Sequence, residues 1–309
     1  MRRSVMVGVA GVVAVVASVA GTGPVHAGLP GRMAPASAAG YWLAAEDGGV
    51  FSFGGAPFYG SGVTVPVACA FSPQPPSTGN GSSGCVAITP TPSGSGYWLL
   101  NAFRWPSAYG QAAQPLQSGC TGLNGASGNW AGMTSSATGN GFLMVSSNGA
   151  VVGCGDARPA GGLASLSLAA PVVGMASTPD HNGYWMVGAD GGVFTFGDAS
   201  FYGSMGGTPL NGLVVGMAAT PDGRGYWLTS ADGGVFSFGD AAFNGSMGGS
   251  HLNAPVVGIA ATPDGKGYWL AASDGGVFSF GGARFEGSMG GRPINAPVVG
   301  IAAWPAVPG

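Results

Sequence analysis

Short apolar runs alternate with turn-forming residues along most of the chain. In one stretch, apolar side chains dominate residues 172–177, 184–189 and 193–196. Residues 178–180 (Thr-Pro-Asp) separate the first two runs, where Pro presets φ for a turn and Asp hydrogen-bonds to the nearby backbone. Residues 190–192 (Asp-Gly-Gly) separate the next two, because Gly accepts the positive φ of a tight hairpin. Runs this short predict three β-strands rather than helices.

This strand pattern is repeated along the chain. "GYW" occurs at residues 40, 96, 183, 225 and 267, and "GFL" at 141 is a weaker copy. From residue 141 onward the copies are 42 residues apart. The earlier, longer spacings place an insertion at residues 66–84. Units of three or four strands and this length are typical of propeller blades. We therefore predict an all-β, six-bladed β-propeller over residues 40–305.

The two ends of the repeat predict how the propeller closes. The first unit starts at "GYW" and lacks the apolar strand that precedes it elsewhere, whereas residues 297–305 repeat that strand after the last unit. Pairing of this segment with blade 1 would close the ring and leave no exposed sheet edge. We expect the small residues of the first strands to crowd near the ring axis. The Tyr-Trp pairs and the "VFxF" phenylalanines should pack between blades.

The repeat resembles a known type of sequence. "GYW…DGGVFxFGDAxFxGSMGG" over residues 40–304 resembles a repeat of secreted and cell-wall-associated proteins of actinobacteria, where it sometimes accompanies cell-wall hydrolase domains. "ADGGVFSFGDAAFNGSMGG" is also distantly similar to propellers of the regulator-of-chromosome-condensation type, a family that includes secreted bacterial inhibitors of β-lactamases. Phe238-Gly239 stands where that family has Trp-Gly, and residues 245–248 stand one position late for Gly-Gln-Leu-Gly. No hydrolase domain accompanies the repeats here, so the resemblance implies a fold and an extracellular setting but no catalysis.

The N-terminus predicts export. Arg2 and Arg3 precede an apolar run from Val5 to about Ala20, and residues 25–27 (Val-His-Ala) fit a cleavage site. We predict a signal peptide at 1–27, a linker at 28–39 and a short tail at 306–309, with an uncleaved anchor as the alternative. Cleavage would change the net charge from −3 to −5. No other run is long enough to span a membrane. The predicted localisation is extracellular, with association to the cell wall as an option.

Four cysteines accompany this export signal: Cys69, Cys85, Cys120 and Cys154. An even number in an exported chain favours disulfides, although free buried thiols are the alternative. Cys69 lies in the insertion and Cys85 begins the next strand, so a bond between them would close a short loop. Cys120 and Cys154 are then paired by elimination.

The chemistry-bearing residues argue against catalysis. His181 and His251 occupy turn positions and are expected to be solvated, and Lys266 is the one lysine. Most acidic residues are repetitive turn residues, so a Ca²⁺ site is not favoured and no metal or cofactor is predicted. No nucleophile elbow, zinc motif or phosphate loop is present. With 7% charged residues the chain has no electrostatic footprint for nucleic acid.

One hairpin departs strongly from the repeat. Four copies read "DGGVF", whereas blade 2 has "FRWPS" at residues 103–107. Aromatic residues beside an arginine are common in binding hot spots, and loops on rigid scaffolds often carry function. The insertion should lie at the same end of blade 2. We therefore predict a ligand site formed by Phe103, Arg104, Trp105 and Tyr109, with burial of these aromatics under the insertion as the alternative.

Together these features predict a secreted, monomeric binding module. Its ligand would be a cell-envelope glycan or an extracellular protein. A dedicated protein inhibitor of an extracellular enzyme and a structural surface protein are the alternatives.

Overall fold

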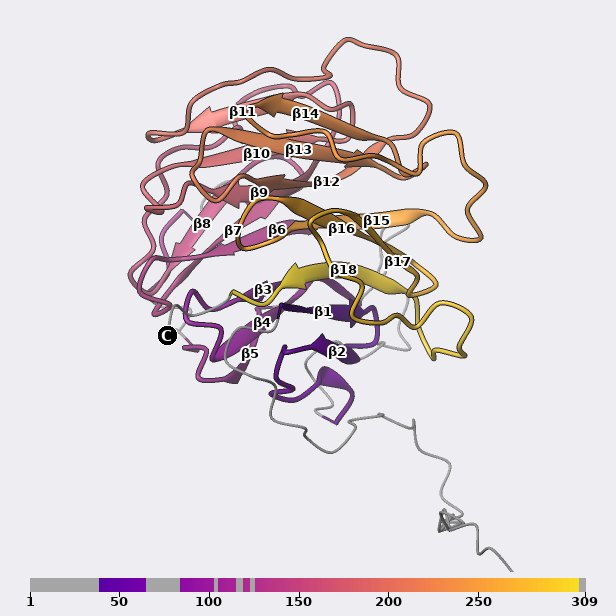
Figure 1. Cartoon of the computed structure of the whole chain (residues 1–309). Helices are drawn as coiled ribbons and strands as arrows, with labels where there is room; N and C mark the ends of the chain where they lie inside the picture. Colours follow the sequence, from indigo (N-terminus) through magenta and orange to yellow (C-terminus); the bar gives the residue numbers. More distant parts are fainter. Residues whose placement is uncertain (1–38, 65–83, 103–104, 115–118, 123–125, 306–309) are drawn as a thin grey trace, which may run out of the picture.

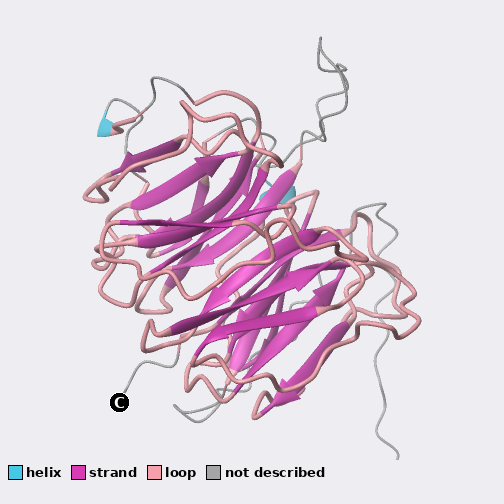
Figure 2. Cartoon of the chain, turned by 90° about the horizontal axis from the view of Figure 1, so that it is seen from above, coloured by secondary structure: helices cyan, strands magenta, loops and turns pink. Residues whose placement is uncertain are grey.

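The computed structural model describes residues 39–64, 84–102, 105–114, 119–122 and 126–305. The predicted signal peptide, nearly all of the linker, most of the insertion and the tail lie outside these ranges. The described chain forms six three-stranded antiparallel sheets, each made by one repeat unit. Strands make up most of the regular structure, and loops join them at their ends (Figure 2). The prediction of an all-β fold built from six repeats is confirmed.

We number the sheets by their "GYW" or "GFL" strand. Sheet 1 contains β18 (Val298–Ala303), β1 (Gly40–Ala45) and β2 (Val50–Gly54), and a 3-10 turn, η1, follows at Gly62–Thr64. Sheet 2 contains β3 (Cys85–Pro90), β4 (Gly96–Asn101) and β5 (Ser107–Gly110). Sheet 3 contains β6 (Trp130–Ser135), β7 (Phe142–Ser146) and β8 (Val151–Cys154). Sheet 4 contains β9 (Val172–Ser177), β10 (Tyr184–Gly188) and β11 (Val193–Phe196). Sheet 5 contains β12 (Val214–Ala219), β13 (Gly225–Ser230) and β14 (Val235–Gly239). Sheet 6 contains β15 (Val256–Ala261), β16 (Gly267–Ala272) and β17 (Val277–Gly281).

The C-terminal strand completes sheet 1, as the sequence predicts. β18 pairs antiparallel with β1, so that Trp42 lies opposite Ala302. The amide of Trp304 extends this pairing by donating to the carbonyl oxygen of Gly40 over 2.8 Å. Figure 1 shows the yellow end of the chain beside the indigo strands. Residues far apart in sequence are therefore joined in one sheet.

The first strands of the sheets contact one another in a fixed order. β3 contacts β6, and contacts then follow from β6 to β9, β12, β15 and β18; β18 in turn contacts β3. Small residues make this approach possible, because a side chain added at Gly132 would come 3.1 Å from the Cα of Gly174. Gly216, Gly258 and Gly300 hold the same position in the next strands, and Ala87 holds it in β3. The predicted crowding of the first strands is confirmed.

Aromatic side chains fill the space between neighbouring sheets. The tryptophan and tyrosine of each "GYW" are fully buried. Tyr226 of sheet 5, for example, packs 5.7 Å from Trp185 of sheet 4, measured between ring centroids. Its hydroxyl donates to the carbonyl oxygen of Gly203 over 2.6 Å, which ties sheet 5 to the segment that follows sheet 4. The "GYW" motif therefore joins the sheets as well as filling their cores. Within the described residues no helix is long and apolar enough to cross a membrane.

Candidate functional site

Only part of the predicted "FRWPS" site lies within the described residues. Phe103 and Arg104 lie outside them. Trp105 is half-buried and its ring lies 6.4 Å from that of Trp130 in sheet 3. Tyr109, in β5, packs 5.7 Å from Tyr97, and burial raises the pKa of its phenol.

The two described aromatics of this site face different neighbours. Trp105 belongs to the hydrophobic cluster between sheets 2 and 3, whereas Tyr109 belongs to the cluster between sheets 1 and 2. The structure therefore does not bring Trp105 and Tyr109 together on one surface. A ligand-binding role for the "FRWPS" hairpin stays a prediction.

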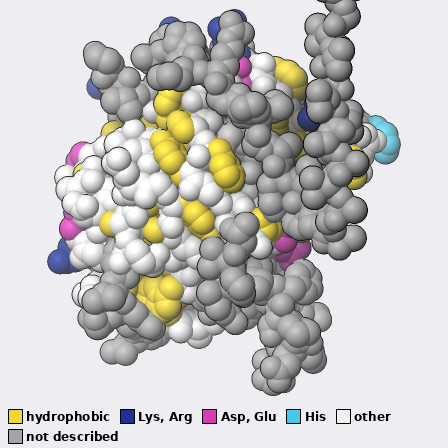
Figure 3. Space-filling model, turned by 90° about the horizontal axis from the view of Figure 1, so that it is seen from below, with side chains coloured by type: hydrophobic (Ala, Val, Ile, Leu, Met, Phe, Trp, Pro, Cys, Tyr) yellow, Lys and Arg dark blue, Asp and Glu magenta, His cyan; other side chains and the backbone are white. Residues whose placement is uncertain are grey.

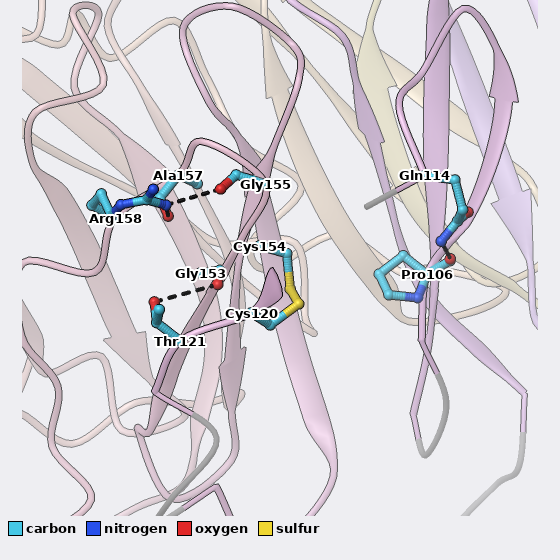
Figure 4. Close-up of a disulfide and its surroundings, with 9 residues drawn as sticks. All are labelled: Pro106, Gln114, Cys120, Thr121, Gly153, Cys154, Gly155, Ala157 and Arg158. Carbon is cyan, nitrogen blue, oxygen red and sulfur yellow. Dashed lines mark hydrogen bonds between the residues drawn. A yellow bond between two sulfur atoms is a disulfide. The ribbon is translucent and has the colours of Figure 1, made fainter. Parts of the chain in front are cut away.

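A disulfide marks the boundary between sheets 2 and 3. Cys120 and Cys154 are bonded, with Cα atoms 4.1 Å apart, which confirms the predicted pair (Figure 4). Cys85 is also disulfide-bonded, and Cys69, its predicted partner, lies outside the described residues. Sheet 3 has Phe142 where other sheets have the bridging tyrosine. The bond from Cys154, directly opposite Phe142 in the sheet, thus ties sheet 3 to the segment that follows sheet 2, where no tyrosine hydroxyl does so.

A second departure lies at the boundary between sheets 3 and 4. His181 has a φ of 59° and is the one non-glycine residue with positive φ in the described ranges. The repeat has Gly223 and Gly265 at this place, with φ values of 72° and 69°. A β-carbon costs free energy in this conformation, and such strain tends to occur at ligand sites. His181 was expected to be a solvated turn residue; it is in a turn, but it is half-buried.

The strained histidine is matched by a change in the neighbouring sheet. A β-carbon added at Gly223 would come 2.6 Å from Cδ of Pro179, and one at Gly265 would come 2.9 Å from Cδ of Pro221. Sheet 3 has Ala137 where the other sheets have this proline. The absence of a proline ring at 137 leaves room for the β-carbon of His181. The two substitutions therefore depend on each other sterically.

The imidazole of His181 is fixed in orientation. Its Nδ1 lies 2.8 Å from the carbonyl oxygen of Ser135, across the sheet boundary. A carbonyl oxygen only accepts, so Nδ1 carries the proton and Nε2 of the neutral ring is left as an acceptor. The ring is thereby held at the edge of the space between the two sheets.

The same turn of sheet 4 lacks the base that sheets 5 and 6 carry, and in this it is like sheets 2 and 3, which have Ser95 and Asn140 there. In sheet 5 the side chain of Arg224 lies 4.0 Å from the carboxylate of Asp222, and in sheet 6 Lys266 lies 3.6 Å from Asp264. Sheet 4 has Asn182 at this place, which donates its side-chain amide to Asp180 over 2.8 Å. Hydrogen bonds from Thr178 and then from Asn182 lower the pKa of Asp180 to about 2. Asp180 is therefore an ionised carboxylate without the neighbouring cation.

These departures line one cleft. A hollow of about 450 Å³ lies between sheets 3 and 4, within the size range of small-molecule sites. Its polar walls come from Thr138, Asp156, Arg158, Asp180, His181 and Asn182. Leu143, Ala157, Pro159 and Ala160 supply apolar surface. We call this hollow the sheet 3–4 cleft.

Asp156 and Arg158 place opposite charges on the sheet 3 wall. Burial acts to raise the pKa of the Asp156 carboxyl, but hydrogen bonds from Ser136 and Thr138 outweigh it, so the pKa lies below its usual range. One guanidinium nitrogen of Arg158 donates hydrogen bonds to the carbonyl oxygens of Gly155 and Ala157, at 2.9 and 3.1 Å (Figure 4). Its other N–H groups are available because a guanidinium has five donors.

The sequence contained a signal for this cleft. Gly changes to His at 181 and Pro changes to Ala at 137, whereas Asn182 has its match in Asn140 of sheet 3. Only the structure shows that these positions face each other across two sheets. In the described part of the chain, no three His, Cys, Asp or Glu side chains are grouped so that they could hold a metal ion. No family model and no curated protein matches the chain.

Proposed function

We propose that this chain is a secreted, closed six-bladed β-propeller that serves as a binding module for a cell-envelope glycan or an extracellular protein. The contacts of the six first strands, which return from β18 to β3, support the closed ring. The disulfide-bonded cysteines support export, because such bonds persist in oxidising compartments. The resemblance of the repeat to cell-wall-associated proteins supports the class of ligand.

The sheet 3–4 cleft carries the proposal. Its walls offer carboxylate acceptors at Asp156 and Asp180, guanidinium donors at Arg158 and an acceptor at Nε2 of His181. A few oriented polar groups around a partly apolar floor are typical of sites that select a polar ligand. Hydroxyl groups of a saccharide, or polar side chains of a protein segment, match this mixture of donors and acceptors.

The proposed role is binding rather than catalysis. Hydrogen bonds lower the pKa of both Asp156 and Asp180, so both are ionised at neutral pH and neither is suited to donate a proton. Nδ1 of His181 is bonded to a backbone carbonyl, which holds the imidazole in one orientation. The side chains are thus arranged as fixed hydrogen-bonding groups.

The test replaces residues of the cleft with those that stand at the equivalent positions of other sheets. The variant Ala137→Pro/His181→Gly/Asn182→Arg installs the proline of the other sheets and the Gly-Arg pair of sheet 5, and it removes the imidazole from the cleft. Wild type, this variant and the control Lys266→Asn, which alters the matching turn of sheet 6, are tested for co-sedimentation with purified cell wall and for capture of proteins from culture supernatant. We expect wild type and control to bind and the repaired variant to lose at least tenfold in affinity. Equal binding by all three proteins would show that the cleft is not the site.

A further inference from the structure

Four exposed phenylalanines occupy the same position of the repeat. Phe58, Phe201, Phe243 and Phe285 are exposed by 49%, 59%, 61% and 60%, and follow the third strands of sheets 1, 4, 5 and 6. These four sheets are consecutive in the order of strand contacts. Among the described residues they make up four of the six large hydrophobic side chains that are this exposed. We call them the phenylalanine row.

The backbone around each of these rings is fixed on both sides. At Phe243, the indole of Trp227 donates to the carbonyl oxygen of the preceding Ala242 over 2.8 Å. The amide of the following Asn244 donates to the hydroxyl of Tyr268, in the next sheet, over 3.1 Å. The same two bonds hold the other three positions. Each ring is therefore presented to solvent from a rigid backbone.

The fold does not need phenylalanine at this position. Sheet 2 has Gln114 there, and the bond from Trp98 to the preceding Ala113 is kept at 2.6 Å. Sheet 3 has Pro159 there, and the amide of Ala160 still donates to the hydroxyl of Tyr184 over 3.2 Å. Exposed apolar area gives the monomer no stability. The folding of the monomer therefore does not explain why four consecutive sheets each expose an aromatic ring.

A groove lies beside one of these rings, and its lining residues indicate the class of ligand that fits there. Phe285 lines a hollow of about 290 Å³ together with His251, Asn253, Asp274 and Ser288. An aromatic wall next to amide, carboxylate, imidazole and hydroxyl groups matches a pyranose ring, whose C–H face packs on the aromatic ring while its hydroxyls bond to the polar groups.

The repeat places similar groups beside two further rings. Asn211 and Asp232 stand in equivalent positions for Phe243, and Asn295 and Asp47 do so for Phe58. The register of strands is the same in these sheets, with Phe53, Phe238 and Phe280 each opposite the tyrosine of "GYW". The same residue types therefore recur at equivalent positions in these three sheets.

We propose that the phenylalanine row is a set of saccharide subsites that binds a neutral, repeating polysaccharide through several weak contacts. The rings stand one to a sheet, whereas the core of a protein interface is a continuous apolar patch. The molecule seen from below, in Figure 3, shows hydrophobic side chains in small separate patches where it is not covered by grey atoms. A periodic ligand fits a periodic surface, and linked weak sites gain affinity through avidity.

This proposal is independent of the sheet 3–4 cleft, because the row and its groove share no lining residue with the cleft. Repair of the cleft should leave the row intact, and loss of the row should leave the cleft intact. Failure of one site is therefore distinguishable from failure of the other.

Phe→Gln variants at the four positions test the row, since the same backbone already holds Gln114 in sheet 2. Wild type and variants with one to four substitutions are compared by native affinity electrophoresis in gels containing glycogen, laminarin, galactomannan or hydroxyethylcellulose. Leu166→Gln, which alters an exposed leucine outside the row, is the control. We expect at least one polysaccharide to retard wild type and control. Dissociation constants should rise stepwise to about 100-fold or more in the quadruple variant.

Three outcomes would overturn the proposal. The first is that none of the four polysaccharides retards the wild type. The second is that the quadruple variant, with an unchanged melting temperature, is retarded as strongly as the wild type. The third is concentration-dependent self-association of the wild type, seen by sedimentation velocity and lost in the quadruple variant, which would assign the row to contacts between copies of the chain.

Discussion

Two boundaries between sheets differ in their turn residues although they belong to the same repeat. Between sheets 5 and 6, Gly265 packs against Pro221, and Lys266 lies beside Asp264 in its own turn. Between sheets 3 and 4, His181 takes the place of the glycine and Ala137 that of the proline, and a cleft is present. Sheets 4 and 6 keep the same strand pairing, from the first strand to the second and from the second to the third. Strand pairing thus supplies a common frame, while the turn residues differ from one boundary to the next.

The boundary between sheets 2 and 3 adds a third case. There a disulfide replaces the hydroxyl bridge that a tyrosine makes elsewhere, because Phe142 has no hydroxyl. Departures from the repeat therefore gather on sheets 2, 3 and 4, and the regular boundaries lie between sheets 4, 5, 6 and 1. The predictions that follow separate these two parts of the molecule.

The largest effect is expected from removal of the closing strand. Deletion of residues 296–309 exposes the edge of β1 and uncovers the aromatic cluster between sheets 6 and 1. We expect loss of solubility or a sharp fall in melting temperature, measured by circular dichroism. Deletion of 306–309 alone, which leaves β18 in place, is the control. A long deletion that melts like the full chain would contradict closure by β18.

The disulfide should matter more than a hydroxyl bridge. Replacement of Cys120 and Cys154 by serine releases a loop of sequence separation 34, which is worth about 3–4 kcal/mol in the chain-entropy model. Tyr226→Phe, at the regular boundary between sheets 4 and 5, should cost about 1–2 kcal/mol for its lost hydrogen bond. Urea unfolding measures both free energies. An equal or smaller loss for the cysteine variant would mean that the bond does not compensate for the missing tyrosine.

His181 and Ala137 should be energetically coupled. Ala137→Pro alone brings a proline ring against the β-carbon of His181 and should destabilise the fold by about 1–3 kcal/mol. The same change made together with His181→Gly should cost nothing or increase stability, because the strained φ is relieved. A double-mutant cycle on urea unfolding gives the coupling free energy. Additive effects would disprove the steric link between the two positions.

The tyrosines that bridge neighbouring sheets should give the same dependence of stability on pH at both kinds of boundary. Burial raises the pKa of Tyr41, between sheets 6 and 1, and of Tyr184, between sheets 3 and 4, to about 12 in each case. The unfolded chain ionises near the ordinary value of about 10. The stability these phenols contribute is therefore complete below about pH 10 and is lost as the pH rises toward 12.

Alkaline unfolding with detection of tyrosinate absorbance measures this effect. Tyr41→Phe and Tyr184→Phe should each flatten the fall in stability between about pH 10 and 12. An unchanged profile in both variants would show that neither phenol is protected by burial.

Most of the fold could be predicted because the repeat determines it. The recurrence of "GYW" gives the six sheets, the hairpin glycines give the strand ends, and residues 297–305 give the strand that completes sheet 1. The Cys120–Cys154 pair was predicted correctly as well. These features depend on local turn chemistry, on the spacing of repeated motifs and on the number of cysteines, all of which can be read from a single sequence.

The site could not be predicted to the same extent, because it depends on contacts between units. His181 looked like a solvated turn residue, since nothing in its own sheet shows the carbonyl of Ser135 beside it. Trp105 and Tyr109 are close in sequence, yet they pack on different neighbours. The phenylalanine row is visible in the sequence, but whether those rings are buried or exposed follows from tertiary structure alone.

The central claim, that departures from the repeat build the ligand site, is tested most directly by mapping a bound ligand. ¹⁵N-labelled protein is titrated with soluble fragments of the purified cell wall, and amide chemical shifts are followed by NMR. The account predicts saturable shifts at residues 135–138, 156–160 and 180–182. Binding that leaves these amides unmoved, while the matching turns at 222–224 or 264–266 shift, would contradict it.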